Sequence, residues 1–286
     1  MSTSCRPDTH LCTKHNVVTN YRGKHVIIIV MKFDGKGFAK TIEATLRHRL
    51  RGGVRVPKIV SVLVGNDPAS VLYTGLKQKA AERVGIDFEV VRLDTVTKEL
   101  IKVIAEREDV TGIMIQLPVP GLHGQALVEI LSVIPYAKDV DGLRYPESGV
   151  VPPVVSAIMR VIDNIVESQK LEIGNQKIVV VGARGFVGSG VVSELAKKGI
   201  EVVGVERGDD MEVIKAGDIV ISAVGEEGII KTELVKEGAM VIDVGAPKGD
   251  MTLEVYQKAS VSVEVPGGVG PVTIACLMEN ACKNGH

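Results

Sequence analysis

Lys77 and the tyrosine four residues before it, Tyr73, have types and spacing that suit chemistry on a bound ligand. On a helix, residues four apart lie on one face. A lysine that transfers protons near neutral pH needs its ammonium destabilised by burial or by a neighbouring cation. An aromatic ring on the same face can stack on a flat heterocycle. Composition alone favours an ordinary exposed lysine, so the chemical interpretation depends on other segments.

Two further polar residues extend this interpretation. Gln116 follows a short apolar segment and could orient the lysine through its amide. Asp141 could accept hydrogen bonds from exocyclic amines, although Asp141-Gly142 also suits an Asx-turn without chemistry. Spacing alone does not group these residues with Tyr73 and Lys77.

A glycine loop suggests a second site. Gly182, Gly185 and Gly188 follow the apolar segment KIVVV and would let the backbone approach a pyrophosphate at a helix N-terminus. The spacing departs from G-x-G-x-x-G, but a strand, loop, helix and strand follow in order. Glu206 ends the second strand and would bind ribose hydroxyls, which favours NAD. Arg184 or Arg207 could instead hold a 2′-phosphate, so NAD and NADP both stay open.

The elements that must position these residues alternate between strands and helices. The helix with Lys77 should begin after Asp67, with Pro68 at its first position, and end at Gly85. Gln116 should lie near the carboxyl end of a strand, where ligands gather in open α/β sheets. The alternation predicts an α/β fold with two doubly wound lobes joined near residue 150.

Composition excludes several classes of function. The 286 residues are 45% hydrophobic and 24% charged, which is typical of one large or two medium domains. Aromatic residues make up only 3% and tryptophan is absent, which argues against base-stacking surfaces for single-stranded nucleic acid. Residues 1–60 carry 12 Lys and Arg against 3 Asp and Glu. No recognition motif accompanies this excess, so we expect a solvated or disordered basic arm and no nucleic-acid partner.

The start of the chain is expected to be a flexible extension over residues 1–30. The apolar segment Val26 to Met31 is too short for a signal peptide or a membrane span. The four cysteines suit free thiols in a reducing cytoplasm. Cys5, His10, Cys12 and His15 meet no zinc spacing, so no metal site is expected.

Five segments in order resemble the bifunctional methylenetetrahydrofolate dehydrogenase/methenyltetrahydrofolate cyclohydrolase family. They cover roughly residues 31–284, and five co-linear motifs are far more specific than any single one. The segments are GNDPASVLYTGLKQKAAERVGI, IQLPVP, PYAKDVDGL, VIDVG and VPGGVGPVTIACLMEN.

The resemblance implies a folate-binding lobe over residues 31–148, to which residues 268–286 return, and a Rossmann-like NAD(P)-binding lobe over residues 149–267. It implies that Lys77 is the catalytic lysine, Gln116 its partner, Tyr73 the ring that stacks on folate and Asp141 the residue that holds the pterin. It implies further substrate contacts from Pro118, Pro266, Gly267 and Gly268. It implies dinucleotide contacts from Gly182, Ala183, Arg184, Gly185, Gly188, Glu206, Arg207 and Ala246. A homodimer that uses NADP or NAD without metal is implied as well.

The chain departs from the family motifs around the dinucleotide. Gly182, Ala183 and Arg184 replace G-R-S, and Glu206 and Arg207 replace H-S. The usual P-C-T-P is PPVV, from Pro152 to Val155. The resemblance therefore predicts the folate reactions and leaves the choice of dinucleotide open.

Three alternatives remain at this point. The chain could be a cyclohydrolase only, an NAD(P) dehydrogenase of another pterin-like substrate, or a nucleotide-binding regulator without activity.

Overall fold

A computed structural model describes residues 11–21, 24–53 and 55–284 of the chain, which divide into two compact units. The three-stranded unit comprises Ala39–Ser156 with the chain from Thr273 onward. The seven-stranded unit comprises Ala157–Val272 with the chain up to Phe38. The boundary at Phe38 differs from the expected domain start at residue 31. The reason is that strand β2 (Lys24–Phe33) pairs in parallel with β10 (Val261–Val263) of the seven-stranded unit.

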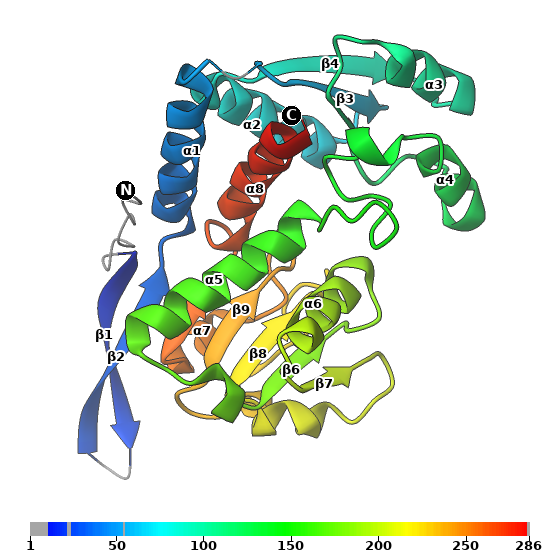
Figure 1. Ribbon diagram of the computed structural model, residues 1–286. Coiled ribbons are helices and arrows are strands. Elements are labelled where there is room, and N and C mark those ends of the chain that lie inside the picture. The colour runs from blue at the N-terminus through cyan, green and yellow to red at the C-terminus, as the bar shows by residue number, and fades with distance from the viewer. Residues whose placement is uncertain (1–10, 22–23, 54, 285–286) are drawn as a thin grey trace. The chain divides into compact units, whose positions relative to one another are not determined.

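The three-stranded unit has a parallel sheet in the order β4-β3-β5. Six of the seven residues of β3 are buried, as expected for a strand covered on both faces. Figure 1 shows α3 and α4 side by side at one end of this sheet. The strands are β3 (Lys58–Val64), β4 (Asp87–Leu93) and β5 (Gly112–Ile115), and the helices are α1 (Gly35–Arg51), α2 (Pro68–Val84), α3 (Lys98–Glu106) and α4 (Gly124–Leu131), with 3-10 turn η1 (Tyr136–Lys138).

Helix α2 begins and ends where the sequence predicts. The Asp67 carboxylate accepts a hydrogen bond of 2.8 Å from the Ser70 amide, and Pro68 takes the first helical position. At the other end Gly85 has a φ of 93° and donates its N–H to the Ala81 carbonyl. The helix is therefore held in register with β3 and β4, against which it packs.

The seven-stranded sheet has the order β1-β2-β10-β9-β8-β6-β7 and is parallel except for β1. Helices α5 and α6 cover the face of the sheet that is turned to the viewer in Figure 1. The remaining strands are β6 (Ile178–Val181), β7 (Val202–Val205), β8 (Ile219–Ser222) and β9 (Met240–Asp243). The helices are α5 (Pro153–Gln169), α6 (Phe186–Lys197) and α7 (Leu253–Lys258), with 3-10 turns η2 (Ile173–Asn175), η3 (Met211–Ala216) and η4 (Thr232–Leu234). Helix α8 (Val269–Asn284) begins in this unit and belongs to the three-stranded unit from Thr273 onward.

This sheet confirms the predicted Rossmann-like lobe. Strands β6, β8 and β9 are buried along their whole length. They read in the sequence as continuous apolar runs, which is the pattern of parallel strands packed on both faces. The carboxyl ends of the parallel strands meet at one edge, where open α/β sheets bind ligands.

The expected flexible extension over residues 1–30 does not hold for residues 12–21 and 24–30. β1 (Cys12–Tyr21) and β2 form an antiparallel hairpin that extends the sheet beyond β10. Strand β1 contains Val17, Val18 and Thr19, which pair with residues of the run VIIIV in β2. Such β-branched residues favour strands. The polar character of the segment concealed this preference. Residues 1–10, with Cys5 and His10, lie outside the described residues.

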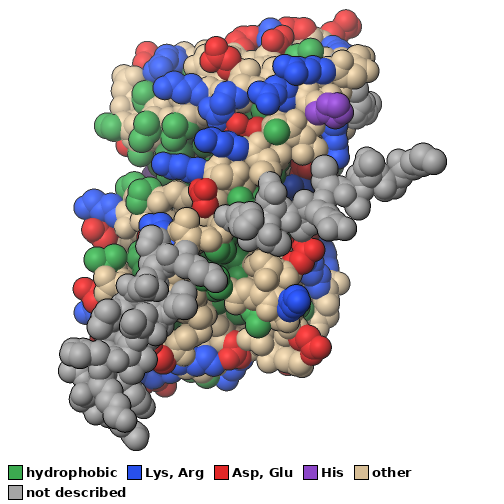
Figure 2. Space-filling view, turned by 90° about the vertical axis from the view of Figure 1, so that its left-hand side faces the viewer, with side chains coloured by type: hydrophobic (Ala, Val, Ile, Leu, Met, Phe, Trp, Pro, Cys, Tyr) green, Lys and Arg blue, Asp and Glu red, His purple; other side chains and the backbone are tan. Residues whose placement is uncertain are grey.

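The basic excess near the start of the chain lies partly on α1. Lys36, Lys40, Arg47, Arg49 and Arg51 are exposed, whereas Ile42 and Leu46 are buried at helical spacing. Figure 2 views the side that carries α1 and shows Lys and Arg gathered over it. These charges therefore form the solvated face of an amphipathic helix. Over the described ranges, no helix has the length and apolar character that crossing a membrane requires.

Candidate functional site

Lys77 and Gln116 are joined by a hydrogen bond that links α2 to the end of β5. The Lys77 Nζ donates to the Gln116 Oε1 at 2.9 Å. The Gln116 Nε2 donates to the Leu117 carbonyl at 2.8 Å, which fixes the amide so that its oxygen faces the lysine. The Gln116 backbone is held in turn by the Val62 carbonyl of β3, 2.9 Å from the Gln116 amide nitrogen. The sheet therefore positions an acceptor for the lysine.

Burial and charge act on Lys77 in opposite directions. Burial lowers the pKa of the Lys77 ammonium, and the negative charge of Asp141 partly opposes this. Burial likewise raises the pKa of the Asp141 carboxyl, while Lys77 lowers it and Asp139 raises it. A lysine in these surroundings can give up and regain a proton more easily than an exposed one, as a general acid or base must.

The loop that carries Asp141 is anchored on both sides. Asp139 is fully buried and accepts hydrogen bonds of 2.9 Å from the amides of Leu143 and Arg144. Asn280 of α8 donates its Nδ2 to the Val140 and Val151 carbonyls, at 3.1 and 3.2 Å. Sequence reasoning missed Asn280, whose signal is a polar residue in the mostly apolar segment ACLMENAC. These contacts therefore anchor the chain on both sides of Asp141.

Tyr73 and Pro118 lie in the same unit as these residues. Tyr73 stands one turn before Lys77 on α2 and is partly exposed. Its neighbours Leu72 and Leu76 have exposed fractions of 60% and 41%, which leaves apolar surface beside the ring. Pro118 is exposed two residues after Gln116. The structure thus brings Lys77, Gln116 and Asp141 together, with the tyrosine on the lysine's own helix.

The glycine loop after β6 forms the second candidate site. Gly182 has a φ of 78° and donates its N–H to the Val205 carbonyl at 2.8 Å. A Cβ on Gly188 would collide with the Gly182 carbonyl oxygen, so α6 and the loop pack backbone to backbone. Gly185 precedes α6, and no side chain caps the helix there. Amides at such a helix start can face an anion such as a pyrophosphate.

A cavity of about 590 Å³ opens beside this loop. Gly182, Gly185, Glu206 and Arg207 line it, and apolar side chains such as Val224 and Ile229 form other walls. Its size and mixed lining suit a small-molecule ligand. Together with the glycine cradle, these residues fit a dinucleotide. Ala183 is partly exposed next to the cradle, and Ala246 is exposed on the loop after β9.

Two buried carboxylates hold the loops around this cavity, and sequence reasoning missed their role. Asp250 accepts hydrogen bonds from the Ser222 Oγ and from the amides of Val224 and Glu226, at 2.7, 2.8 and 2.9 Å. Asp243 accepts from the Tyr256 hydroxyl at 2.6 Å and from the amides of Gly245, Asp250 and Met251. The available signal in the sequence was an acid at the end of a strand, Asp243, and an acid directly after a glycine, Asp250.

The Pro266–Gly268 loop lies between β10 and α8. Gly267 has a φ of 109°, and the Gly268 amide donates to the Glu264 carbonyl at 2.9 Å. A Cβ on Gly35 would collide with the Gly268 carbonyl oxygen, so the start of α1 packs on this loop through backbone atoms. Gly35 was not singled out in the sequence.

Comparison with known proteins yields two family models that match in succession. Residues 33–141 match the tetrahydrofolate dehydrogenase/cyclohydrolase catalytic domain, and residues 156–286 match the NAD(P)-binding domain of the same name. The bifunctional protein FolD of Staphylococcus saprophyticus is 36% identical over 215 residues, which are 69% of this chain and 73% of that protein. FolD of Helicobacter pylori is 31% identical over 221 residues, which are 71% and 74% of the two chains.

Solved structures agree with these matches. The bifunctional FolD methylenetetrahydrofolate dehydrogenase/cyclohydrolase of Campylobacter jejuni has a TM-score of 0.78 at 30% identity, covering 89% of this chain and 98% of that one. The N5,N10-methylenetetrahydrofolate dehydrogenase-cyclohydrolase of Trypanosoma brucei, solved with NADP and an inhibitor, has a TM-score of 0.77 at 30% identity, covering 90% and 97%.

Proposed function

Since this chain belongs to the tetrahydrofolate dehydrogenase/cyclohydrolase family, we propose that Lys77, Gln116, Tyr73 and Asp141 carry its folate chemistry. The protein is a bifunctional enzyme of one-carbon metabolism. It oxidises methylenetetrahydrofolate to methenyltetrahydrofolate with NAD or NADP and hydrolyses the product to formyltetrahydrofolate. The observation that supports the assignment of residues is the partly buried hydrogen bond between the Lys77 amine and the Gln116 amide.

In the oxidation, the methylene carbon that bridges two folate nitrogens loses a hydride, and a nitrogen lone pair forms the C=N bond of the methenyl product. When bound, NAD or NADP accepts this hydride. The protein contributes chiefly orientation, which can replace much of the entropy cost of bringing two reactants together. Gly182, Gly185 and Gly188 would hold the pyrophosphate.

In the hydrolysis, water adds to the positively charged methenyl carbon and loses a proton. The bond from this carbon to one folate nitrogen then breaks as that nitrogen takes up a proton. The hydroxyl proton passes to solvent as the C=O bond forms, and the formyl group stays on the other nitrogen. Lys77 would accept the first proton as an amine and return one as an ammonium. The Gln116 amide would keep the Lys77 Nζ in place during both transfers.

Tyr73 and Asp141 would bind the pterin. A partly exposed ring on α2 offers a face for stacking on the flat heterocycle. A buried carboxylate fits the exocyclic amine and ring N–H of a pterin, which donate hydrogen bonds in parallel. Pro118, exposed two residues after Gln116, would add a further substrate contact within this unit.

The test of this assignment is Lys77→Met, with Lys79→Met as the matched control on the exposed part of the same helix. We expect the Lys77 variant to lose hydrolysis of methenyltetrahydrofolate by about 10²–10⁴-fold, measured from the decay of methenyl absorbance. Folate binding, measured by calorimetry, should persist. The control should hydrolyse at the wild-type rate. Full hydrolysis by Lys77→Met would remove the lysine from the mechanism.

Family membership sets aside the three alternatives, which were a cyclohydrolase alone, an enzyme of another pterin-like substrate and an inactive regulator. We also propose that the enzyme is a cytoplasmic homodimer. Among the described residues, Cys12, Cys276 and Cys282 form no disulfide, which suits a reducing compartment. Sedimentation equilibrium would measure the oligomeric state, and a monomer at micromolar concentration would contradict the dimer.

A further inference from the structure

Glu206 occupies the position from which a Rossmann fold reads the adenosine ribose. It is the first residue after β7, the strand that neighbours β6, and its side chain lines the cavity beside the glycine loop. An acid at this place accepts hydrogen bonds from the ribose hydroxyls of NAD. The 2′-phosphate of NADP would place its negative charge beside the negative charge of the Glu206 carboxylate.

The Glu206 side chain is held in place by the glycine loop itself. The backbone N–H of Arg184 donates to the Glu206 Oε1. The Glu206 amide donates to the Asp209 Oδ2 at 2.8 Å, which fixes the turn after β7. A carboxylate has about four acceptor positions, so after this contact it can still accept from both ribose hydroxyls. The Glu206 side chain is therefore held by contacts within the glycine loop and the turn after β7.

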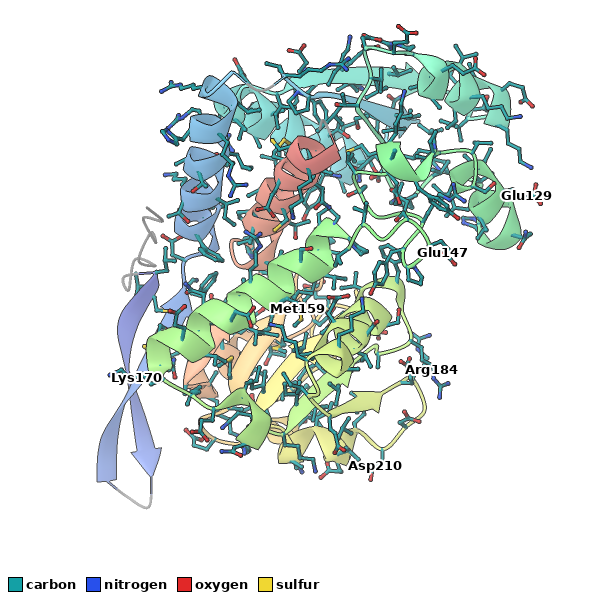
Figure 3. All side chains as sticks on the ribbon, in the orientation of Figure 1. Glu129, Glu147, Met159, Lys170, Arg184 and Asp210 are labelled. Carbon is teal, nitrogen blue, oxygen red and sulfur yellow. The ribbon has the colours of Figure 1, made fainter. Side chains whose placement is uncertain are left out.

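The nearby arginines do not form a phosphate clamp. The Arg207 guanidinium pairs with the Glu226 Oε2 at 3.0 Å, with exposed fractions of 88% and 53% for the two side chains. An ion pair of a guanidinium this exposed is weak, and the same exposure would weaken a contact of Arg207 with a 2′-phosphate. Arg184 is exposed, and Figure 3 shows its side chain directed outward from the loop. Glu206 and Arg207 both line the cavity, but the Glu206 carboxylate is held there by a backbone amide of the glycine loop, whereas the Arg207 guanidinium is largely exposed.

We infer that this enzyme uses NAD in preference to NADP, and that Glu206 is the residue that determines the preference. The inference rests on the proposed function only in taking the seven-stranded unit to bind a dinucleotide. NAD can donate hydrogen bonds from both ribose hydroxyls to the carboxylate, whereas NADP has a phosphate in place of the 2′-hydroxyl, so it loses that hydrogen bond and meets a like charge. NAD binding is expected to be at least about tenfold tighter, or 1.4 kcal/mol.

The test measures equilibrium binding of NAD and NADP separately by calorimetry, without any turnover. In Glu206→Ser, NAD should bind at least about tenfold more weakly and the preference should disappear or reverse. Glu212→Ser removes an exposed carboxylate from η3 and serves as the matched control, with the wild-type ratio expected.

Circular dichroism and retained binding of NADP provide a second readout, because binding of NADP reports the seven-stranded unit itself. Wild-type secondary structure together with NADP binding would show that Glu206→Ser is folded. Equal or tighter binding of NADP by the wild-type protein would overturn the inference, and so would an unchanged ratio in folded Glu206→Ser. If NAD binds tightly but neither folate reaction occurs, the proposed function fails and the inference about NAD stands.

Discussion

At the scale of single residues, Lys77 shows how surroundings select a protonation state. Burial disfavours its ammonium, and the Asp141 carboxylate favours it. Gln116 is a neutral acceptor, so it orients the amine without adding a charge that would hold the proton. A glutamate at position 116 would act as a second anion and stabilise the ammonium. The amide therefore suits a lysine that must change its protonation during each turnover.

The pH dependence of hydrolysis should reveal this balance. If Lys77 acts first as a base, the rate rises with pH as the ammonium loses its proton. Asp141→Asn removes the negative charge that raises the pKa of Lys77, so the midpoint of the rise in kcat should move to lower pH. Asp94→Asn, on an exposed loop of the same unit, should leave the midpoint unchanged.

The profile of kcat is the appropriate measurement, because it reports the enzyme with substrate bound. Weaker folate binding by Asp141→Asn then appears in KM and does not disturb the midpoint. A midpoint that moves to higher pH would contradict the assigned effect of Asp141 on Lys77.

At the scale of elements, both sites depend on loops that are held by buried polar side chains. Asp139 and Asn280 hold the loop around Asp141. Asp250 does the same for the loop after β8, whose Val224 lines the cavity. Chain segments without regular structure need such partners for their backbone groups. These residues are positioning residues, because they fix the chain that carries the binding groups.

Asp250→Asn should weaken both stability and dinucleotide binding. The amide keeps one acceptor oxygen but loses the charge that strengthens the bonds from Ser222, Val224 and Glu226. We expect a loss of about 2–4 kcal/mol in the free energy of unfolding, measured by urea denaturation. The Kd for NAD should rise while hydrolysis at low temperature persists.

Glu237→Gln, an exposed acid of the same unit, is the control for the charge change and should behave as the wild type. A purely structural role would alter only the unfolding curve. Wild-type affinity for NAD in folded Asp250→Asn would therefore show that this loop does not shape the dinucleotide site.

At the scale of the whole molecule, the two sets of site residues lie in different compact units. Hydrogen exchange should therefore separate their ligands. NAD should slow amide exchange at residues 182–188 and 206–211, and a folate analogue should slow it along α2 and at residues 139–144. Exposed α3 serves as an internal reference. Protection by the folate analogue that is confined to the seven-stranded unit would contradict the assignment of Lys77 and Asp141.

Much of this architecture was predictable because it follows from local rules. The capping residues Asp67 and Gly85 and the apolar strands predicted α2 and the Rossmann-like sheet correctly. The pairing of Lys77 with Gln116 was not accessible from spacing, because the two residues lie on different elements and only the family resemblance joined them. The β1–β2 hairpin and the role of Asp250 depend on partners distant in the chain, namely β10 and the loop after β8.

The backbone packing at Gly182 and Gly188 has a consequence for how this enzyme can evolve. The proposed cradle for the pyrophosphate consists of main-chain atoms and leaves no room for a side chain at Gly188. Substitutions at this position are therefore excluded. The residue that discriminates between dinucleotides stands apart from it, after β7. A single codon change at Glu206 could thus switch a descendant enzyme between the cellular pools of NAD and NADP, while the main-chain cradle stays unchanged.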